Sequence, residues 1–162
     1  MKTMEGGGRA ELAAALAGKG AHVDFEGAIR NFPPELRGVK PEKVPHTGWQ
    51  LLEHLRITQA DILDFCVNPK YQELKWPDEY WPVSAAPPDE AAWEQSIAAF
   101  RRDVKAMQDL VSDAGRDLHS RIPHGDGQTL FREAILVIDH NSYHLGQLVF
   151  VRQLLGSWPP AK

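Results

Sequence analysis

Two histidines about one helical turn apart are the residues of this sequence whose spacing points most directly to chemistry. His140 and His144 lie in the run DHNSYHLGQ (residues 139–147), inside a long stretch with apolar side chains at helical spacing. Since an α-helix turns once in about 3.6 residues, both imidazoles leave the same face, about 6 Å apart along the axis. Neutral imidazole suits zinc, nickel, iron or copper. The sequence has seven histidines in 162 residues, so this pair alone is a weak signal.

A third histidine, His54, lies in another segment with helical spacing of apolar residues. Metal sites in helical bundles are built from side chains that project inward from facing helices. His54 on one helix, with His140 and His144 on another, predicts a three-histidine site with open positions, as in catalytic zinc sites. The alternative is that each is an ordinary hydrogen-bonded histidine at the edge of a core, and spacing alone does not decide between the two.

The residues around the histidines exclude two other kinds of metal site. Asn141 follows His140, so the H-E-x-x-H motif of zinc proteases is absent from the sequence. A ferritin-like di-iron bundle needs Glu-x-x-His pairs. The positions three residues before the histidines are instead Leu51, Val137 and Asn141. The missing carboxylates predict one metal ion rather than two.

Four neighbouring polar residues are candidates for supporting roles. Gln147 lies about one turn beyond His144, so it is a candidate contact for substrate or for a metal-bound water, with a polar residue at the bundle edge as the alternative. No other catalytic residue is assigned. Asp139, Asn141 and Glu53 directly flank the histidines and point about 100° away from them. We therefore expect these three at caps or on the surface.

The remaining chemically active residues carry weaker signals. Cys66 has apolar neighbours and is expected to be a buried, inert thiol. His124 precedes a helix in a Gly-rich loop and is expected on the surface, with approach to a substrate as the alternative. Trp76 and Trp81 are expected to cover the core, although an aromatic loop can also form the wall of a pocket. No role is predicted for His22, His46 and His119.

Four amphipathic segments must position these residues. Apolar side chains at helical spacing predict one broken helical segment and three further helices, over residues 9–32, 47–67, 89–111 and 129–155. Thr47 is the expected N-cap of the second segment and Gly156 the C-terminal cap of the last. The connection that follows residue 68 is long enough that its aromatics should order it or that it carries function. The prediction is an all-α four-helix bundle with long connecting loops, whose topology remains open.

Composition narrows the class of protein. The length favours a single domain over residues 1–162, with the Gly-rich residues 1–8 disordered. One cysteine excludes an internal disulfide and suits a reducing compartment. No secretory signal and no membrane-spanning stretch is found. The formal net charge is −4 and no basic block is present, which disfavours nucleic-acid binding. We expect a cytoplasmic, soluble protein.

The sequence resembles the DinB/YfiT-like superfamily in the segment around His54, in the D-H-x-x-x-H-x-G-Q run at 139–147 and in the L-L-G ending at 154–156. The resemblance covers residues from about 49 to 156, and more loosely the first helix. It implies a four-helix bundle, often a homodimer, with a metal held by His54, His140 and His144. Characterised relatives include thiol-dependent transferases and isomerases that use bacillithiol, mycothiol or glutathione. Many relatives have no known reaction, so the resemblance supports the site better than the substrate.

Two functions from different classes follow. The first is a metal-dependent enzyme with a mononuclear three-histidine site that transfers a low-molecular-weight thiol to a small electrophilic substrate, or isomerises or hydrolyses it. Its expected cofactor is one divalent ion, zinc or nickel first, with iron and manganese as alternatives. The second is a non-catalytic, metal-binding, dimeric bundle protein related to stress. A solvent-accessible route to the three histidines would favour the enzyme.

Overall fold

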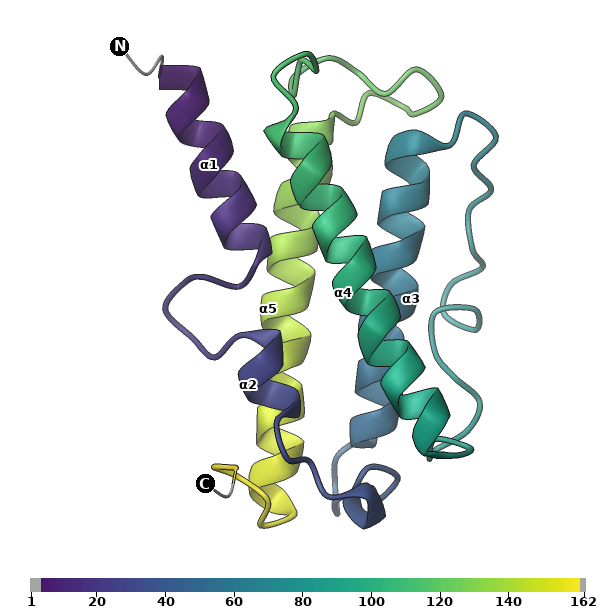
Figure 1. The fold of residues 1–162 in the computed structure, drawn as a ribbon. Helices are drawn as coiled ribbons and strands as arrows, with labels where there is room; N and C mark the ends of the chain where they lie inside the picture. The colour runs from purple at the N-terminus through teal and green to yellow at the C-terminus, as the bar shows by residue number, and fades with distance from the viewer. Residues whose placement is uncertain (1–3, 161–162) are drawn as a thin grey trace.

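The computed structural model describes residues 4–160, and its regular structure is helical (Figure 1). Four long helices, one short helix and one 3-10 turn make up the fold: α1 (Met4–Leu16), α3 (Gly48–Val67), α4 (Glu90–Ser112), α5 (Leu130–Leu154), α2 (Phe25–Ile29) and Pro34–Leu36. Within the described range, β-type pairing is limited to an isolated bridge between Arg121 and Thr129. The predicted all-α class is confirmed. None of the helices in residues 4–160 is both long enough and apolar enough to cross a membrane.

The ends of the long helices follow local capping chemistry. The Thr47 hydroxyl accepts a hydrogen bond from the backbone N–H of Gln50, and the Gln50 side chain accepts one from the N–H of Thr47. This reciprocal pair satisfies two backbone donors that a helix start leaves free. The Thr129 hydroxyl caps α5 by accepting a hydrogen bond from the backbone N–H of Arg132. After α5, Gly156 has φ of +70°, in the left-handed region that favours glycine at a helix end.

The amino-terminal region is interrupted as its glycines predict. α1 ends at Leu16, Gly18 follows with φ of +74°, and α2 begins only at Phe25. Of the residues expected to be disordered, 4–8 form the first turns of α1 instead. Residues 1–3 lie outside the described range.

The four long helices form a bundle with a long crossover. α3 packs against α4 and α5, and α1 packs against the same two helices. In Figure 1, α3 and α4 run in the same direction, while α1 and α5 run opposite to them. Because α3 and α4 are parallel, the connection between them must return along the full length of the bundle. The topology left open by the sequence is therefore not simple up-and-down.

The connection over residues 68–89 is tied to the side of α3. The hydroxyls of Tyr71 and Tyr80 donate hydrogen bonds to the two carboxylate oxygens of Asp61, at 3.0 and 2.7 Å. Burial and the nearby Asp61 carboxylate raise the pKa of both phenols, which keeps both protonated as donors. The prediction that aromatics order this connection is confirmed for these two residues. Trp76 does not cover the core as expected, because 70% of it is exposed.

The buried apolar side chains form two clusters at different levels of the bundle. The first includes Phe25, Phe32, Trp49, Leu52, Leu55, Trp93, Phe100, Leu145 and Leu148. The second includes Leu12, Leu16, Ile62, Met107, Val111 and Val137. Along α5, His140 and His144 stand between the contributions to the two clusters. Apolar packing on both sides therefore holds this part of α5 against α3.

Candidate metal centre

The three histidines singled out by the sequence come together between α3 and α5. His54 projects from α3, and His140 and His144 project from α5. The Nε2 atom of His54 lies 3.2 Å from Nε2 of His144 and 3.0 Å from Nε2 of His140. One ligand atom from each residue fits within a span of 4.8 Å, and no Asp, Glu or Cys of the described residues joins this group. The three ligand nitrogens therefore converge on one point, which is the focus of the three-histidine group.

Hydrogen bonds on the far side of two imidazoles determine which nitrogen faces that focus. Nδ1 of His54 lies 2.8 Å from the backbone oxygen of Tyr80, which can only accept, so this nitrogen carries the proton. Nδ1 of His144 donates in the same way to the side-chain oxygen of Gln147, at 2.7 Å. In the neutral rings both Nε2 atoms then present lone pairs. Two lone pairs facing each other at 3.2 Å repel, and a cation between them removes the conflict.

The spacing also matches the size of such a cation. Metal–nitrogen bonds of about 2.0–2.1 Å in a tetrahedral arrangement place two ligand nitrogens about 3.3 Å apart. The two measured Nε2 separations are 3.0 and 3.2 Å. The three residues therefore fit a divalent ion with nitrogen ligands. Because the three imidazoles are neutral, they do not offset the positive charge of such an ion.

Burial keeps the imidazoles in the neutral form that binds a metal. Burial, together with the neighbouring histidines, lowers the pKa of His140 to about 3. Burial likewise lowers the pKa of His54 to about 4, although the Tyr80 carbonyl acts in the opposite direction. The pKa of His144 is lowered mainly by burial. At neutral pH, none of the three needs to lose a proton before it binds a metal.

An aromatic stack fixes the plane of the His54 ring. Trp81, from the connection over residues 68–89, stacks on His54 with ring centres 3.8 Å apart and planes within 4°. His46 stacks on the other face of Trp81, also at 3.8 Å. The expectation that Trp81 covers the core describes only part of its position, since it forms one wall of the histidine group. His46, for which no role was predicted, belongs to this stack.

The residues that flank the histidines are more deeply placed than the sequence suggested. Glu53 is buried and accepts hydrogen bonds from Arg56 and Ser96. Asn141 is buried and donates to Gln59 on α3, at 3.0 Å. The expectation of caps or surface positions was wrong for both, because polar partners across the helix interfaces allow them to be buried. Asp139 is exposed, as expected.

The other candidates lie away from the histidine group. Cys66 is half-buried, and burial raises the pKa of its thiol to about 12, which agrees with an inert thiol. His124 is exposed and hydrogen-bonds the backbone oxygen of Phe65. His22 hydrogen-bonds Ser142, also at the surface. The structure therefore brings none of these three residues to the predicted site.

These features define a class of protein: a helical bundle with three histidines from two helices arranged around one point. The chain belongs to the DinB superfamily, whose family model matches residues 19–148. The matched region contains all three histidines of the group. Neither the comparison with curated proteins nor that with solved structures gave a significant match.

The contact between Gln147 and His144 leads to a prediction about a residue that does not itself face the ion. Gln147→Leu should weaken metal binding by roughly 10–100-fold, because it removes the acceptor that orients the His144 ring. Gln147→Glu retains an acceptor oxygen and should restore most of the affinity. The dissociation constant is measured by competition with a chromogenic chelator.

The matched control for this prediction is Gln153→Leu, since Gln153 is an exposed glutamine on the same helix. It should bind metal as the unmodified protein does. Equal affinities for Gln147→Leu and Gln153→Leu would mean that the hydrogen bond to His144 does not position a ligand.

Proposed function

We propose that this protein is a metal-dependent enzyme that transfers a low-molecular-weight thiol to a small electrophilic substrate. The observation that supports it best is the set of Nε2 atoms 3.0–3.2 Å apart, two of which are held as lone-pair donors by Tyr80 and Gln147. A divalent ion bound there, zinc or nickel first, would supply a positive charge that lowers the pKa of a thiol or a water. Membership of the DinB superfamily agrees with a metal site at these three histidines.

The residues of the chain have separate tasks in this proposal. His54 and His144 are buried and held from behind, so they form the rigid part of the site. His140 is half-buried, and we propose its side of the group as the approach for a thiol and its acceptor. Trp81 stacks on one face of the His54 ring and keeps water away from that face. In the transfer, the thiol loses its proton to solvent and its sulfur forms a bond to the electrophilic carbon of the substrate. The bond from that carbon to its leaving group breaks at the same time: an aryl halide releases a halide ion, and the ring oxygen of an epoxide leaves the carbon and takes up a proton.

The test is a transfer assay with metal-loaded protein. Glutathione, bacillithiol, mycothiol and cysteine are each combined with an aryl halide and with an epoxide, and adduct formation is followed by mass spectrometry. At least one thiol should react faster than in the absence of protein, and His140→Ala should return the rate to background. Cys66→Ser serves as the control, because the proposed reaction does not use this half-buried thiol.

The possible outcomes separate the two classes of function. Turnover that depends on both His140 and the added thiol supports the transferase. Turnover that needs His140 but no thiol supports hydrolysis or isomerisation at the same site. Stoichiometric metal with no turnover of any pair would instead support the non-catalytic, metal-binding protein.

We also propose that the protein is a homodimer that pairs through α5. Five large apolar side chains are exposed along this helix at spacings that keep them on one side: Phe131, Ile135, Tyr143, Phe150 and Leu154. Exposed apolar stripes of this kind usually mark a surface that contacts another protein. It can be covered by the same stripe of a second copy, since a two-fold axis brings identical surfaces together.

Sedimentation at micromolar concentration should therefore give a mass near twice the 18.1 kDa of the chain. The double variant Ile135→Glu/Tyr143→Glu places charges in the stripe and should shift the protein to monomer. Val83→Glu is the control, because Val83 is fully exposed on the connection over residues 68–89 and far from α5 in sequence. A monomer at high concentration for the unmodified protein would exclude the dimer.

A further inference from the structure

Asp61 lies on the same face of α3 as His54, about two helical turns further along the helix. A separation of seven residues corresponds to about 10 Å along the axis of an α-helix. Asp61 is therefore too far away to bind an ion at the three histidines, and it is not part of that group. Both of its carboxylate oxygens nevertheless accept hydrogen bonds from the connection that passes beside the metal centre, through the hydroxyls of Tyr71 and Tyr80.

Tyr80 joins Asp61 to the metal centre, because its two ends are bonded to two levels of α3. The phenol hydroxyl donates a hydrogen bond to Oδ2 of Asp61, at 2.7 Å. The backbone oxygen of the same residue accepts the hydrogen bond from Nδ1 of His54, at 2.8 Å. While the phenol is held, the carbonyl cannot slide along α3 without breaking one of these two bonds. The position of the carbonyl beside His54 therefore depends on Asp61.

The carbonyl of Tyr80 determines which nitrogen of His54 can bind a metal. An acceptor beside Nδ1 keeps the proton on that atom and leaves the lone pair on Nε2, which faces the other two histidines. Without this acceptor the proton can occupy either nitrogen. A ring with the proton on Nε2 must lose it before that nitrogen binds an ion, and this cost weakens the binding of the metal.

The contact with Asp61 is strong enough to hold the connection in place. A carboxylate is a charged acceptor, and hydrogen bonds to charged groups are stronger than those between neutral groups. Asp61, Tyr71 and Tyr80 are each half-buried, which limits the competition from water. Trp81 follows Tyr80 directly and stacks on His54 with ring centres 3.8 Å apart, so the same segment also fixes the plane of the imidazole.

We propose that Asp61 is a positioning residue of the metal centre. It acts through Tyr80: the carboxylate holds the phenol, and the carbonyl of the same residue holds His54 in the tautomer that binds the ion. Asp61 touches neither the ion nor a substrate. This role rests on the candidate metal centre and does not require the proposed thiol transfer.

The first test is the affinity for Zn²⁺, measured by competition with a chromogenic chelator. Tyr80→Phe removes the hydrogen bond to Asp61 but retains the ring, the backbone carbonyl and the negative charge of Asp61. The dissociation constant should rise roughly three- to tenfold, less than the 10–100-fold typical for loss of a direct partner of a ligand. Asp61→Leu should raise it at least as much. Asp61→Asn retains an acceptor oxygen for one phenol and should restore part of the affinity.

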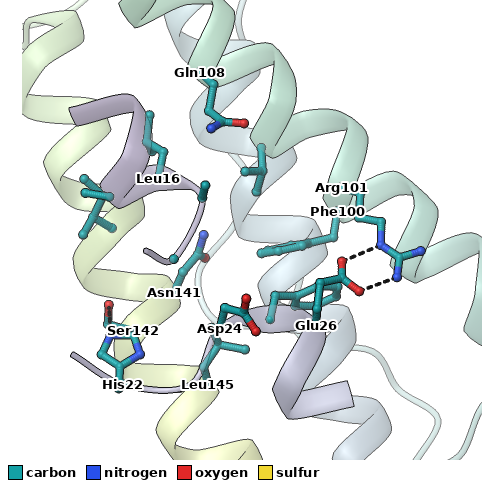
Figure 2. A pocket seen from close by; sticks show the side chains of 16 residues that line it. Leu16, His22, Asp24, Glu26, Phe100, Arg101, Gln108, Asn141, Ser142 and Leu145 are labelled. Atoms are coloured by element: carbon teal, nitrogen blue, oxygen red, sulfur yellow. Dashed lines mark hydrogen bonds and ion pairs between the residues drawn. The ribbon is translucent and has the colours of Figure 1, made fainter. Parts of the chain in front are cut away.

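Two matched controls remove similar hydrogen bonds elsewhere. Tyr71→Phe removes the other donor to Asp61, but the backbone N–H of Tyr71 bonds the carbonyl of Asn68, so its effect on zinc should be smaller than that of Tyr80→Phe. Glu26 on α2 accepts two hydrogen bonds from Arg101 on α4, drawn as dashed lines in Figure 2. It lines a cavity that none of the three histidines lines, so Glu26→Gln should bind zinc as the unmodified protein does.

The second test observes the tautomer of His54 and does not depend on a bound metal. In ¹⁵N NMR spectra of the metal-free protein at pH 7.5, a ring nitrogen that carries a proton is distinguished from one with a lone pair. His54→Gln assigns the signals. The unmodified protein and Glu26→Gln should show the proton of His54 on Nδ1 alone. Tyr80→Phe should show both tautomers, an effect that a general loss of stability does not produce.

The proposal requires both effects in Tyr80→Phe. An unchanged zinc affinity or an unchanged tautomer in the folded variant would overturn it, and so would equal losses of affinity in Tyr80→Phe and Glu26→Gln. If Asp61→Leu fails to fold, Tyr80→Phe still decides, because it changes a single hydroxyl. An unmodified protein that binds no zinc would overturn the metal centre together with this role. Normal zinc binding without thiol transfer would contradict only the proposed reaction.

Discussion

Replacing any one of His54, His140 and His144 by alanine should strip most of the metal from the protein. Each residue contributes one of the three ligand atoms that the described residues place around the focus. Loss of an outer partner of a ligand typically costs about 10–100-fold in affinity, and loss of the ligand itself should cost more. The measurement is elemental analysis of protein purified without a nickel column, where the unmodified chain should carry about one divalent ion.

His119→Ala is the matched control for these three variants. His119 is exposed and packs on Phe131, so its removal should leave the metal content unchanged. A helical circular dichroism spectrum for every variant separates loss of metal from loss of fold. Should one of the three histidine variants keep the full metal content, that histidine is not a ligand.

Removal of the metal by a chelator and a fall in pH should both lower the free energy of unfolding, because both act on the same three histidines. A metal that binds only the native state adds stability of RT ln(1 + [L]/Kd). EDTA at pH 7.5 should therefore lower the melting temperature. The helices should persist after chelation, because the cores around Leu52 and Trp93 and around Met107 and Val111 do not include the ion.

Acid acts on the metal-free protein through the depressed pKa values. The unfolded chain binds protons at these histidines below a pH of about 6.5. The folded protein does not, because burial lowers the pKa of His54 to about 4 and that of His140 to about 3. As the pH falls from about 6.5 towards 4, the unfolded state therefore binds more protons and the folded state loses stability, on the order of 3 kcal/mol for His54 alone.

Urea unfolding of the EDTA-treated protein at pH 7.5, 6.0 and 5.0 measures this loss. The midpoint should fall with pH, and the fall should be smaller in His54→Gln, which has no imidazole to protonate. His119→Gln should behave as the unmodified protein, since that side chain is exposed. A midpoint that does not depend on pH would mean that the histidines are not held neutral. No change on chelation would mean that the purified protein holds no metal.

Local sequence signals determined where the helices of this protein begin. They also determined that His140 and His144 share one face of their helix. Helices start after Thr47, Asp89 and Thr129 because each of these side chains accepts a hydrogen bond from the backbone N–H three positions ahead. Such contacts depend on neighbours in the chain, so they can be predicted from a short window of sequence. The common face of His140 and His144 follows from helical geometry in the same way.

Contacts between distant segments were decided only by the tertiary structure. His54 meets the other two histidines because α3 and α5 pack side by side, and its Nδ1 partner is the backbone of Tyr80 in the following connection. Trp81 stacks on His54 because the parallel arrangement of α3 and α4 draws that connection across the site, and His46, which lies just before α3, stacks on Trp81.

The same reason explains the two polar residues that were wrongly expected at caps or on the surface. Glu53 and Asn141 are buried because Ser96 on α4 and Gln59 on α3 supply their partners. Helical direction alone shows which way a side chain leaves its own helix. It does not show which polar group from another helix will meet it, and that partner determines whether a polar side chain can be buried.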